Sequence, residues 1–321
     1  MIAQRVVWTD RATVMVEAFD IPDLAAGQLL VQTHYTLISP GTERAFLLGL
    51  ENTSQRYPQY PGYNNVGEVL AVGDGVQGFA VGDIVATAAR HASHVIVAAA
   101  DALHVPAGLW EEHAVFFNMG AIALQGVRKA KIELGESVVV LGQGMIGNIA
   151  MQLAKLSGAL PVIGIDTSEH RLALARACGA DATRNPQTSP LDNLTSAVVI
   201  EATGFPEPVK TAFQVAGWHG RVVLLASTRG ETEKVNFYSD VHRKGLTVYG
   251  AHNSVRPAHD STAGFWTARD DGETVLRLLT AGRLVVDNLI SHRLPAVQAA
   301  NAYRQLAEWS ETLMGVVLEW R

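Results

Sequence analysis

The first hundred positions carry their apolar residues in short runs separated by Gly, Pro and Asp. Val, Ile and Thr dominate these runs, and helical periodicity is poor, so the pattern predicts strands. The expected strands are RVVWT (5–9), TVMVEAF (13–19), LLVQTHYTLI (29–38), VGEVLAVG (66–73), DIVATAA (83–89) and HVIVAAA (94–100). The pattern therefore predicts a compact, mostly β domain, such as a partly open barrel.

Strands and helices alternate farther along the chain. Residues 111–130 have apolar positions at helical spacing, and SVVVLG (137–142) is a continuous apolar run, typical of a strand buried on both faces. The next expected elements are a helix at 148–159, strand 161–166, helix 168–180, strand 197–204, a helix from about 207, and strands 221–227 and 246–251. This alternation predicts an α/β domain whose parallel sheet has helices on both faces. The tail adds helices at 272–282 and 297–309 and a strand at 315–320.

A G-x-G-x-x-G motif lies between an expected buried strand and an expected helix. Its residues are Gly142, Gln143, Gly144, Met145, Ile146 and Gly147. In such a motif the first glycine makes the tight turn, the second lets the backbone approach a pyrophosphate, and the third lets the helix pack on the strand. The N–H groups at the start of that helix then face the phosphates. The alternative interpretation is a glycine-rich turn without a ligand.

Asp166 ends the strand that follows this motif. A carboxylate there can accept hydrogen bonds from both ribose hydroxyls and would repel a 2′-phosphate, which favours NAD over NADP. Arg171 lies downstream and could weaken this preference for NAD, but it is interpreted as an exposed helix residue.

Composition narrows the possible functions. The 321 residues allow two domains, and 48% apolar with 17% charged residues is an ordinary globular balance. The net charge of -6 and the lack of basic runs argue against nucleic-acid binding. No apolar run approaches a membrane span, and the first residues lack an apolar signal core, so we expect a cytoplasmic protein. Cys178 is the only cysteine, which excludes sites built from several thiolates.

Several motifs together resemble the medium-chain dehydrogenase/reductase superfamily of the zinc-containing alcohol dehydrogenase type. They are GTE (41–43), PGYNNVGEVLAVGDGV with VGDIV (61–85), KIELGESVVVLGQGMIG (131–147) and the acid at Asp166. The resemblance implies a GroES-like catalytic domain at 1–117 and 253–321 and a Rossmann nucleotide-binding domain at 118–252. It also implies hydride transfer to or from a nicotinamide.

The residues that would bind zinc in that family are replaced in this chain. By resemblance, the ligand positions fall at Pro40, Tyr63, Asn64 and about Phe117, and none of these can replace a thiolate or imidazole ligand. The four cysteines of a structural zinc lobe are missing as well, so we expect no zinc. LISPGTER, PGY and GVVLEW resemble a shorter branch without the zinc ligands that includes bacteriochlorophyllide 3-hydroxyethyl dehydrogenases, although Asn64 departs from the acid expected after PGY.

Without zinc, the oxygen of the substrate needs another proton donor or hydrogen-bond donor. The resemblance places Tyr63 at a ligand position and matches Thr42 to the relay hydroxyl and Glu43 to an acidic residue behind the ligands. Tyr63 is the candidate acid/base, with Thr42 and Asn64 assisting. Alternatively, Tyr63 only fills the space left by the metal.

The histidines are weaker candidates for a proton donor or a metal ligand. By resemblance, His252 lies near the nicotinamide carboxamide and ranks second as a proton donor. His91 and His94 have a metal-like spacing, but on a strand they would point to opposite faces, which favours structural or exposed roles. A zinc site rebuilt from Glu43 and stray histidines is a poor alternative.

The resemblance also implies further cofactor contacts and an assembly. The contacts are Ala202, Thr203, Gly204, Ala226, Ser227, Thr228, Ala251 and Asn253. Tyr57, Tyr60, Tyr63, Phe116 and Phe117 suggest a bulky or aromatic small-molecule substrate, unless these rings are core. A homodimer formed by an edge strand, RVVLLA (221–226) or LTVYG (246–250), is expected.

Three functions therefore compete. The first is NAD-dependent, zinc-independent oxidation of a secondary alcohol or reduction of a ketone. The second is an NAD(P)H-dependent quinone or enone reductase, which delivers hydride to carbon and needs less help at oxygen. The third is a non-catalytic NAD-binding protein.

Overall fold

The computed structural model describes residues 1–257, 266–308 and 310–321. The chain divides into two compact units. Unit 1 comprises 1–119, 272–282 and 290–321, and unit 2 comprises 120–271 and 283–289. Within unit 2, Arg256 donates to the carbonyl of Ala121 and Gln152 bonds the backbone of Val285. The domain boundaries expected from the resemblance stay a prediction.

Unit 1 is built on a seven-stranded sheet, as the β-rich sequence pattern predicted. The strand order is β14-β15-β3-β4-β5-β7, and β6 pairs with β3. The strands are β3 (Gln28–Ile38), β4 (Asn65–Val72), β5 (Ile84–Thr87), β6 (His94–Ala98), β7 (Leu103–His104), β14 (Ile290–Pro295) and β15 (Gly315–Glu319). Leu29, Val31, Val69 and Val85 are fully buried at one core of this sheet.

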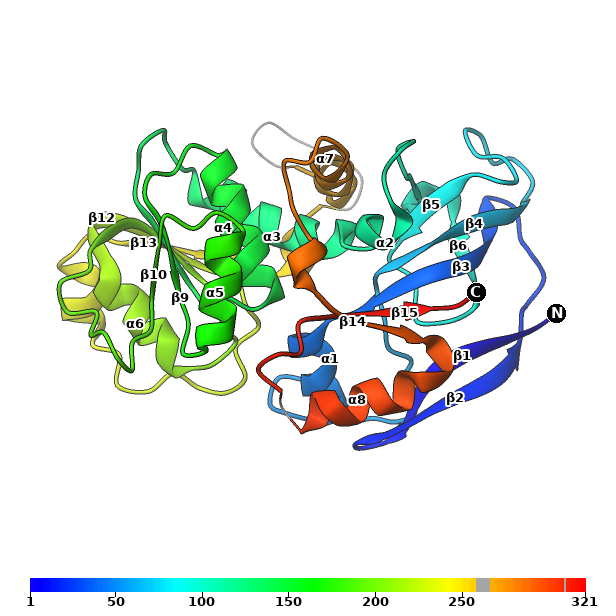
Figure 1. Cartoon of the computed structure of the whole chain (residues 1–321), viewed down its shortest axis with the longest axis horizontal. Helices are drawn as coiled ribbons and strands as arrows, with labels where there is room; N and C mark the ends of the chain where they lie inside the picture. The colour runs from blue at the N-terminus through cyan, green and yellow to red at the C-terminus, as the bar shows by residue number, and fades with distance from the viewer. Residues whose placement is uncertain (258–265, 309) are drawn as a thin grey trace. The chain divides into compact units, whose positions relative to one another are not determined.

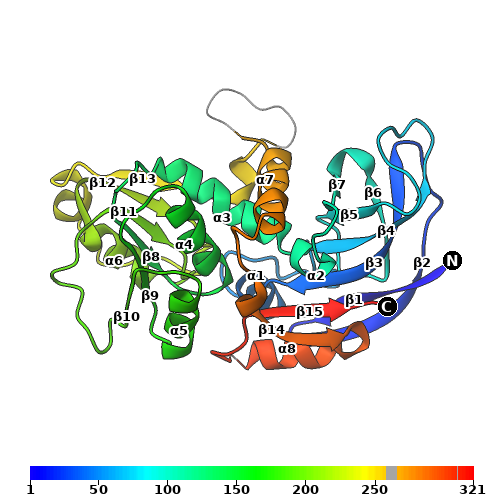
Figure 2. The ribbon, with the colours of Figure 1, turned by 45° about the horizontal axis from the view of Figure 1, so that its top comes forward.

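A two-stranded ribbon and a helix form a second core in unit 1. The ribbon pairs β1 (Ile2–Asp10) with β2 (Thr13–Asp20), and α8 (Ala299–Ala307) contacts β2 and β14. Figure 2 shows α8 along β14 and near the ribbon. Trp8, Leu47 and Tyr303 are buried there. The remaining elements described in unit 1 are α1 (Pro40–Leu47), α2 (Glu111–Ala114), the start of α3 (Phe117–Ala130), part of α7 (Ala268–Thr280), η1 (Ala99–Asp101) and η5 (Ala296–Gln298).

Unit 2 holds a parallel six-stranded sheet (Figure 1). Its strand order is β10-β9-β8-β11-β12-β13, and all six strands are labelled in Figure 2. The strands are β8 (Val138–Leu141), β9 (Val162–Ile165), β10 (Ala182–Arg184), β11 (Ser196–Glu201), β12 (Ala216–Leu224) and β13 (Thr247–Gly250). Its helices include α4 (Met145–Leu156), α5 (Glu169–Ala177) and α6 (Glu207–Val215), with short turns η2 (Tyr238–His242), η3 (Asn253–Val255) and η4 (Asp287–Leu289). This order is that of a Rossmann fold, so the predicted fold class is confirmed.

Two details of the sequence interpretation need correction. β12 lies between β11 and β13, so 221–226 is not an edge strand, whereas β13 is the last strand of the sheet. β6 begins at His94, so His91 precedes that strand.

Trp309, the last residue of the helix predicted at 297–309, lies outside the described residues. In the described part of the chain, no helix is long and apolar enough to cross a membrane.

Candidate active site

The glycine turn of unit 2 follows the buried strand β8 and leads into α4. Gly142 has φ +86°, a value that favours glycine. A Cβ on Gly147 would lie 1.7 Å from the carbonyl oxygen of Gly142, so only glycine lets α4 approach the turn this closely. A Cβ on Gly144, in contrast, would meet no atom within 4 Å. The second glycine therefore faces open space, as it would if a ligand approached its backbone.

Asp166 connects this turn to the next loop. One carboxylate oxygen accepts the backbone N–H of Gln143 at 2.7 Å, and the other accepts that of Ser168 at 2.9 Å. Each oxygen has a second lone pair for another donor, such as a ribose hydroxyl. Gln143 is fully buried, its side chain donates to the carbonyl of Val140, and its backbone N–H is engaged by Asp166, so a cofactor contact by Gln143 stays a prediction. Met145 and Ile146 begin α4, and Met145 is buried.

The other expected cofactor residues follow the carboxyl ends of β11, β12 and β13. Gly204 has φ +78°, and Thr203 donates its backbone N–H to Glu201 at 2.7 Å. Burial raises the pKa of the Glu201 carboxyl, and its hydrogen bonds with Thr203 partly oppose this effect. Ala226, Ser227 and Thr228 follow β12, and Ala251, His252 and Asn253 follow β13. Because all these strands are parallel, these segments line one edge of the sheet together with the glycine turn.

The residues after β13 are held by local contacts. The Ala251 carbonyl accepts from Gln125, and Asn253 accepts from Arg256 at 2.6 Å. The exposed His252 pairs with the Ser254 hydroxyl at 2.7 Å. A proton-donor role for His252 stays a prediction.

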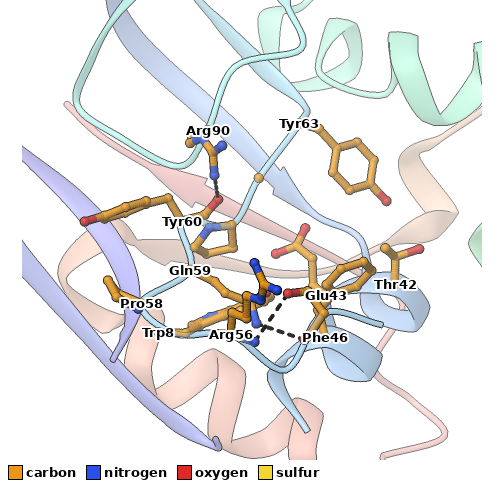
Figure 3. A pocket seen from close by; sticks show the side chains of 13 residues that line it. Trp8, Thr42, Glu43, Phe46, Arg56, Pro58, Gln59, Tyr60, Tyr63 and Arg90 are labelled. Atoms are coloured by element: carbon orange, nitrogen blue, oxygen red, sulfur yellow. Dashed lines mark hydrogen bonds between the residues drawn. The ribbon is translucent and has the colours of Figure 1, made fainter. Parts of the chain in front are cut away.

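Unit 1 contains a pocket of about 440 Å³. It is lined by Trp8, Thr42, Glu43, Phe46, Ser54, Arg56, Pro58, Gln59, Tyr60, Pro61, Gly62, Tyr63 and Arg90. Figure 3 shows the Tyr63 ring directed toward the side of the pocket that carries Thr42 and Glu43. Two of the predicted catalytic residues, Thr42 and Tyr63, therefore share one cavity.

The PGY motif shapes the pocket through backbone geometry. Gly62 has φ +101°, and a Cβ there would lie 2.5 Å from the backbone nitrogen of His91. The carbonyl of Pro61 accepts the N–H of His91 at 2.9 Å, and the carbonyl of Tyr63 accepts from the Asn118 amide at 2.8 Å. These contacts fix the turn that presents the Tyr63 side chain.

Asn64 points elsewhere. It is fully buried, and its amide donates to the carbonyl of Leu37 at 3.1 Å. Asn64 does not line the pocket with Thr42 and Tyr63. Its predicted help at a substrate oxygen would require this amide to leave Leu37.

Of the five aromatic residues considered for substrate contact, only Tyr60 and Tyr63 line the pocket. Phe116 and Phe117 are buried in the core, and the Tyr57 hydroxyl donates to backbone carbonyls.

A buried carboxylate forms one wall of the pocket. Glu43 lies in α1, which begins with Pro40 after the N-cap residue Ser39. Its carboxylate accepts the Ser39 N–H at 2.8 Å, pairs with the His91 ring at 3.1 Å and accepts the Tyr303 hydroxyl. Burial, reinforced by the negative charge of Glu43, raises the pKa of Tyr303 well above its ordinary value. The phenol therefore stays a proton donor to Glu43.

The donor set here does not fit zinc. Pro40 and Phe117 offer no ligand atom, Asn64 is directed at Leu37, and a phenol is not among the usual zinc ligands. Across residues 1–257, 266–308 and 310–321, no cluster of three or more His, Cys, Asp and Glu side chains could hold a metal ion.

Several pocket or wall residues have no role in the sequence interpretation, among them Trp8, Arg56, Arg90 and Tyr303. Tyr303 in particular looks like an ordinary core position of an amphipathic helix. No local signal reveals its partner, because Glu43 is 260 residues away.

Two protein-family models match this chain. Residues 25–126 match the alcohol dehydrogenase GroES-like domain, and residues 146–263 match a family described as zinc-binding dehydrogenase. A D-guloside 3-dehydrogenase from Shigella flexneri is 32% identical over 248 residues, which cover 74% of this chain and 69% of that protein.

Two solved structures share the fold over 99% of both chains. A Sinorhizobium meliloti 1021 protein bound to NADP has a TM-score of 0.85 at 23% identity. A short chain alcohol dehydrogenase from Escherichia coli CFT073, complexed with NADH, has a TM-score of 0.85 at 20% identity. The closer similarity to bacteriochlorophyllide dehydrogenases stays a prediction. The chain belongs to the medium-chain dehydrogenase/reductase superfamily, with an alcohol dehydrogenase-like GroES domain and a Rossmann domain.

Proposed function

We propose that this protein is an NAD-dependent dehydrogenase that interconverts a secondary alcohol and a ketone, with Tyr63 in place of a metal at the substrate oxygen. The observation that carries the proposal is the glycine turn of unit 2. Open space in front of Gly144 and a carboxylate at Asp166 together form the site expected for a dinucleotide. Kinship with a D-guloside 3-dehydrogenase supports the same class of reaction.

Asp166 favours NAD. Two backbone N–H groups hold the Asp166 carboxylate in position. A 2′-phosphate beside this negatively charged group would be repelled. Solved structures of the same fold hold NADP in one case and NADH in another, so the fold itself does not decide the coenzyme.

Unit 1 supplies the groups for the substrate oxygen. A bound nicotinamide donates or accepts the hydride at the substrate carbon. In the direction of ketone reduction, the Tyr63 phenol donates its proton to the oxygen as negative charge develops there. Thr42 lines the same pocket and donates a hydrogen bond to that oxygen. In alcohol oxidation the step reverses: the Tyr63 phenolate accepts the hydroxyl proton, and Thr42 keeps its hydrogen bond to the oxygen.

We also propose a homodimer formed through β13. This strand ends the sheet, and Val248 is 39% exposed, so an apolar edge is left open. Light scattering of the wild type and of Val248→Lys tests this: a dimer that becomes a monomer is expected, and an unchanged mass would contradict it.

A coenzyme and substrate screen tests the function. Purified protein is mixed with NADH or NADPH and then with ketones, quinones or conjugated enones, and nicotinamide fluorescence is followed by stopped flow. Turnover with NADH and ketones is expected. Turnover of enones or quinones with NADPH would favour a reductase, and coenzyme binding without turnover of any compound would indicate a non-catalytic protein.

A further inference from the structure

Two arginines bring positive charge to the pocket of unit 1, and neither forms an ion pair with a carboxylate of the described residues. Arg56 lines the pocket and is exposed, and its guanidinium has no hydrogen-bond or ion-pair partner among the described residues. The exposed guanidinium therefore keeps its charge and its N–H donors available to a ligand, although the chain as a whole carries a net charge of -6.

Arg90 adds a second cation to the same cavity. Its guanidinium donates to the carbonyl of Tyr60 and lies 5.8 Å from the Tyr60 ring centre. Both of these partners are uncharged. Because a guanidinium has five N–H donors, this contact leaves most of its hydrogen-bonding capacity and all of its charge available.

The single acid of the pocket lining is already occupied. Glu43 is 2% exposed, and its oxygens are engaged by the Ser39 N–H, His91 and the Tyr303 hydroxyl. Among the described residues it forms no ion pair with Arg56 or Arg90, and it lies with Thr42 and Tyr63 at the proposed reacting side. Trp8, Phe46 and Pro58 give the pocket apolar walls against which a carbon skeleton can pack.

We propose that this pocket selects an alcohol or ketone substrate that carries an anionic group, a carboxylate or a phosphate, which Arg56 and Arg90 bind. The proposal rests on the proposed function and specifies its substrate class. Arginine suits both anions, because its planar N–H groups can form two parallel charge-assisted hydrogen bonds with either one. The neutral or purely aromatic substrate suggested by the aromatic residues would leave both guanidinium groups unpaired.

Anion binding tests the site independently of turnover. Gluconate, inorganic phosphate and the neutral sugar alcohol glucitol are titrated into protein saturated with NAD at constant ionic strength, and apparent Kd values are derived from the thermal midpoint. A lower Kd for gluconate than for phosphate would indicate that the substrate carries a carboxylate. A lower Kd for phosphate would indicate that it carries a phosphate group. Arg56→Gln should weaken binding of the preferred anion about 10- to 100-fold, as expected for loss of a charge-assisted hydrogen bond.

Two variants control for charge and folding. Arg11→Gln removes the same charge from the exposed β1–β2 turn outside the pocket and should leave the Kd unchanged. Arg56→Lys should retain part of the affinity. Equal anion affinity in wild type and Arg56→Gln, or glucitol binding as tight as that of gluconate and phosphate, would overturn the proposal.

Turnover measurements then distinguish selection of an anionic substrate from the proposed dehydrogenase function, on which this selection rests. The ratio of kcat/KM for an acidic sugar alcohol and its neutral parent should exceed about tenfold and should collapse in Arg56→Gln. Equal turnover of acidic and neutral substrates would overturn anion selection while leaving the dehydrogenase function intact. Arg56-dependent anion binding without nicotinamide turnover would support the anion site and contradict the proposed function.

Discussion

The phenol of Tyr303, on the last helix of the chain, donates a hydrogen bond to the carboxylate of Glu43, on the first. Both side chains are buried, and Glu43 also receives the Ser39 N–H and contacts His91. Residues from three distant parts of the sequence thus hold one charged group at the wall of the pocket. We expect this arrangement to matter for stability and for the position of Thr42, the neighbour of Glu43 in α1.

Tyr303→Phe should lower the free energy of unfolding by about 1.5–3 kcal/mol, because it removes a buried hydrogen bond to a charged acceptor and little volume. Tyr57→Phe is the matched control. It removes the same atom from a phenol that donates only to the neutral carbonyls of Phe46 and Leu47, so its cost should be about 1 kcal/mol. Denaturant titrations that show equal losses for the two variants would contradict a special role of the Glu43 contact.

Alkaline pH should reveal the same contact. The folded protein keeps the Tyr303 proton because its pKa is raised, whereas the unfolded chain loses that proton near the ordinary tyrosine pKa of about 10. The contribution is therefore complete below pH ~10 and is lost as pH rises above it. The free energy of unfolding should fall more steeply above this pH in wild type than in Tyr303→Phe. Parallel curves for the two proteins would contradict the shift.

Tyr63→Phe should reduce kcat about 10²- to 10⁴-fold, the usual contribution of a positioned acid or base, while the Kd for NADH stays unchanged. Tyr35→Phe, on β3 and outside the pocket lining, serves as the control and should keep wild-type turnover. If Tyr63→Phe turned over as fast as wild type with intact coenzyme binding, Tyr63 would only fill space.

Gly144→Ala and Gly147→Ala should fail in different ways. A methyl group on Gly144 meets open space, so the stability should stay within about 0.5 kcal/mol while NADH binding weakens at least about tenfold. A methyl group on Gly147 collides with the Gly142 carbonyl and should cost about 1–3 kcal/mol or more. Thermal unfolding and fluorescence titration measure both effects, and unchanged NADH affinity in Gly144→Ala would place the coenzyme elsewhere.

Asp166→Ala should relax the choice of coenzyme. The substitution removes the charge that repels a 2′-phosphate and also the acceptor for the N–H groups of Gln143 and Ser168. We expect weaker NADH binding and a rise of at least about tenfold in the ratio of NADPH to NADH affinity. Asp181→Ala, which breaks an ion pair with Lys155 elsewhere in unit 2, should leave that ratio unchanged. A ratio unaffected by loss of Asp166 would remove the basis for NAD preference.

Local sequence patterns were sufficient for much of the fold. The β-branched runs of unit 1 and the buried run of β8 identify strands because their signals lie within a few residues. The G-x-G-x-x-G motif predicted the glycine turn for the same reason. The interior position of β12 was not readable, because it depends on β13 pairing at its far side.

The pocket residues that the sequence singles out are those that belong to motifs. Thr42 and Tyr63 belong to short motifs, and the structure brings them to one pocket. The direction of Asn64 depends on the carbonyl of Leu37 in a neighbouring strand, and the partner of Glu43 lies at the other end of the chain. Arg56 belongs to no motif. Only the folded pocket, in which none of the described carboxylates pairs with its guanidinium, points to a role for it.

The most direct test of hydride transfer uses NADH deuterated at its transferable position. The protein is incubated with this coenzyme and the best ketone from the screen, and the product alcohol is analysed by mass spectrometry and NMR. We predict one deuterium on the carbinol carbon in wild type and a much lower yield in Tyr63→Phe. An alcohol product without deuterium, or deuterium found only on the carbon β to a retained carbonyl, would contradict the proposed reaction.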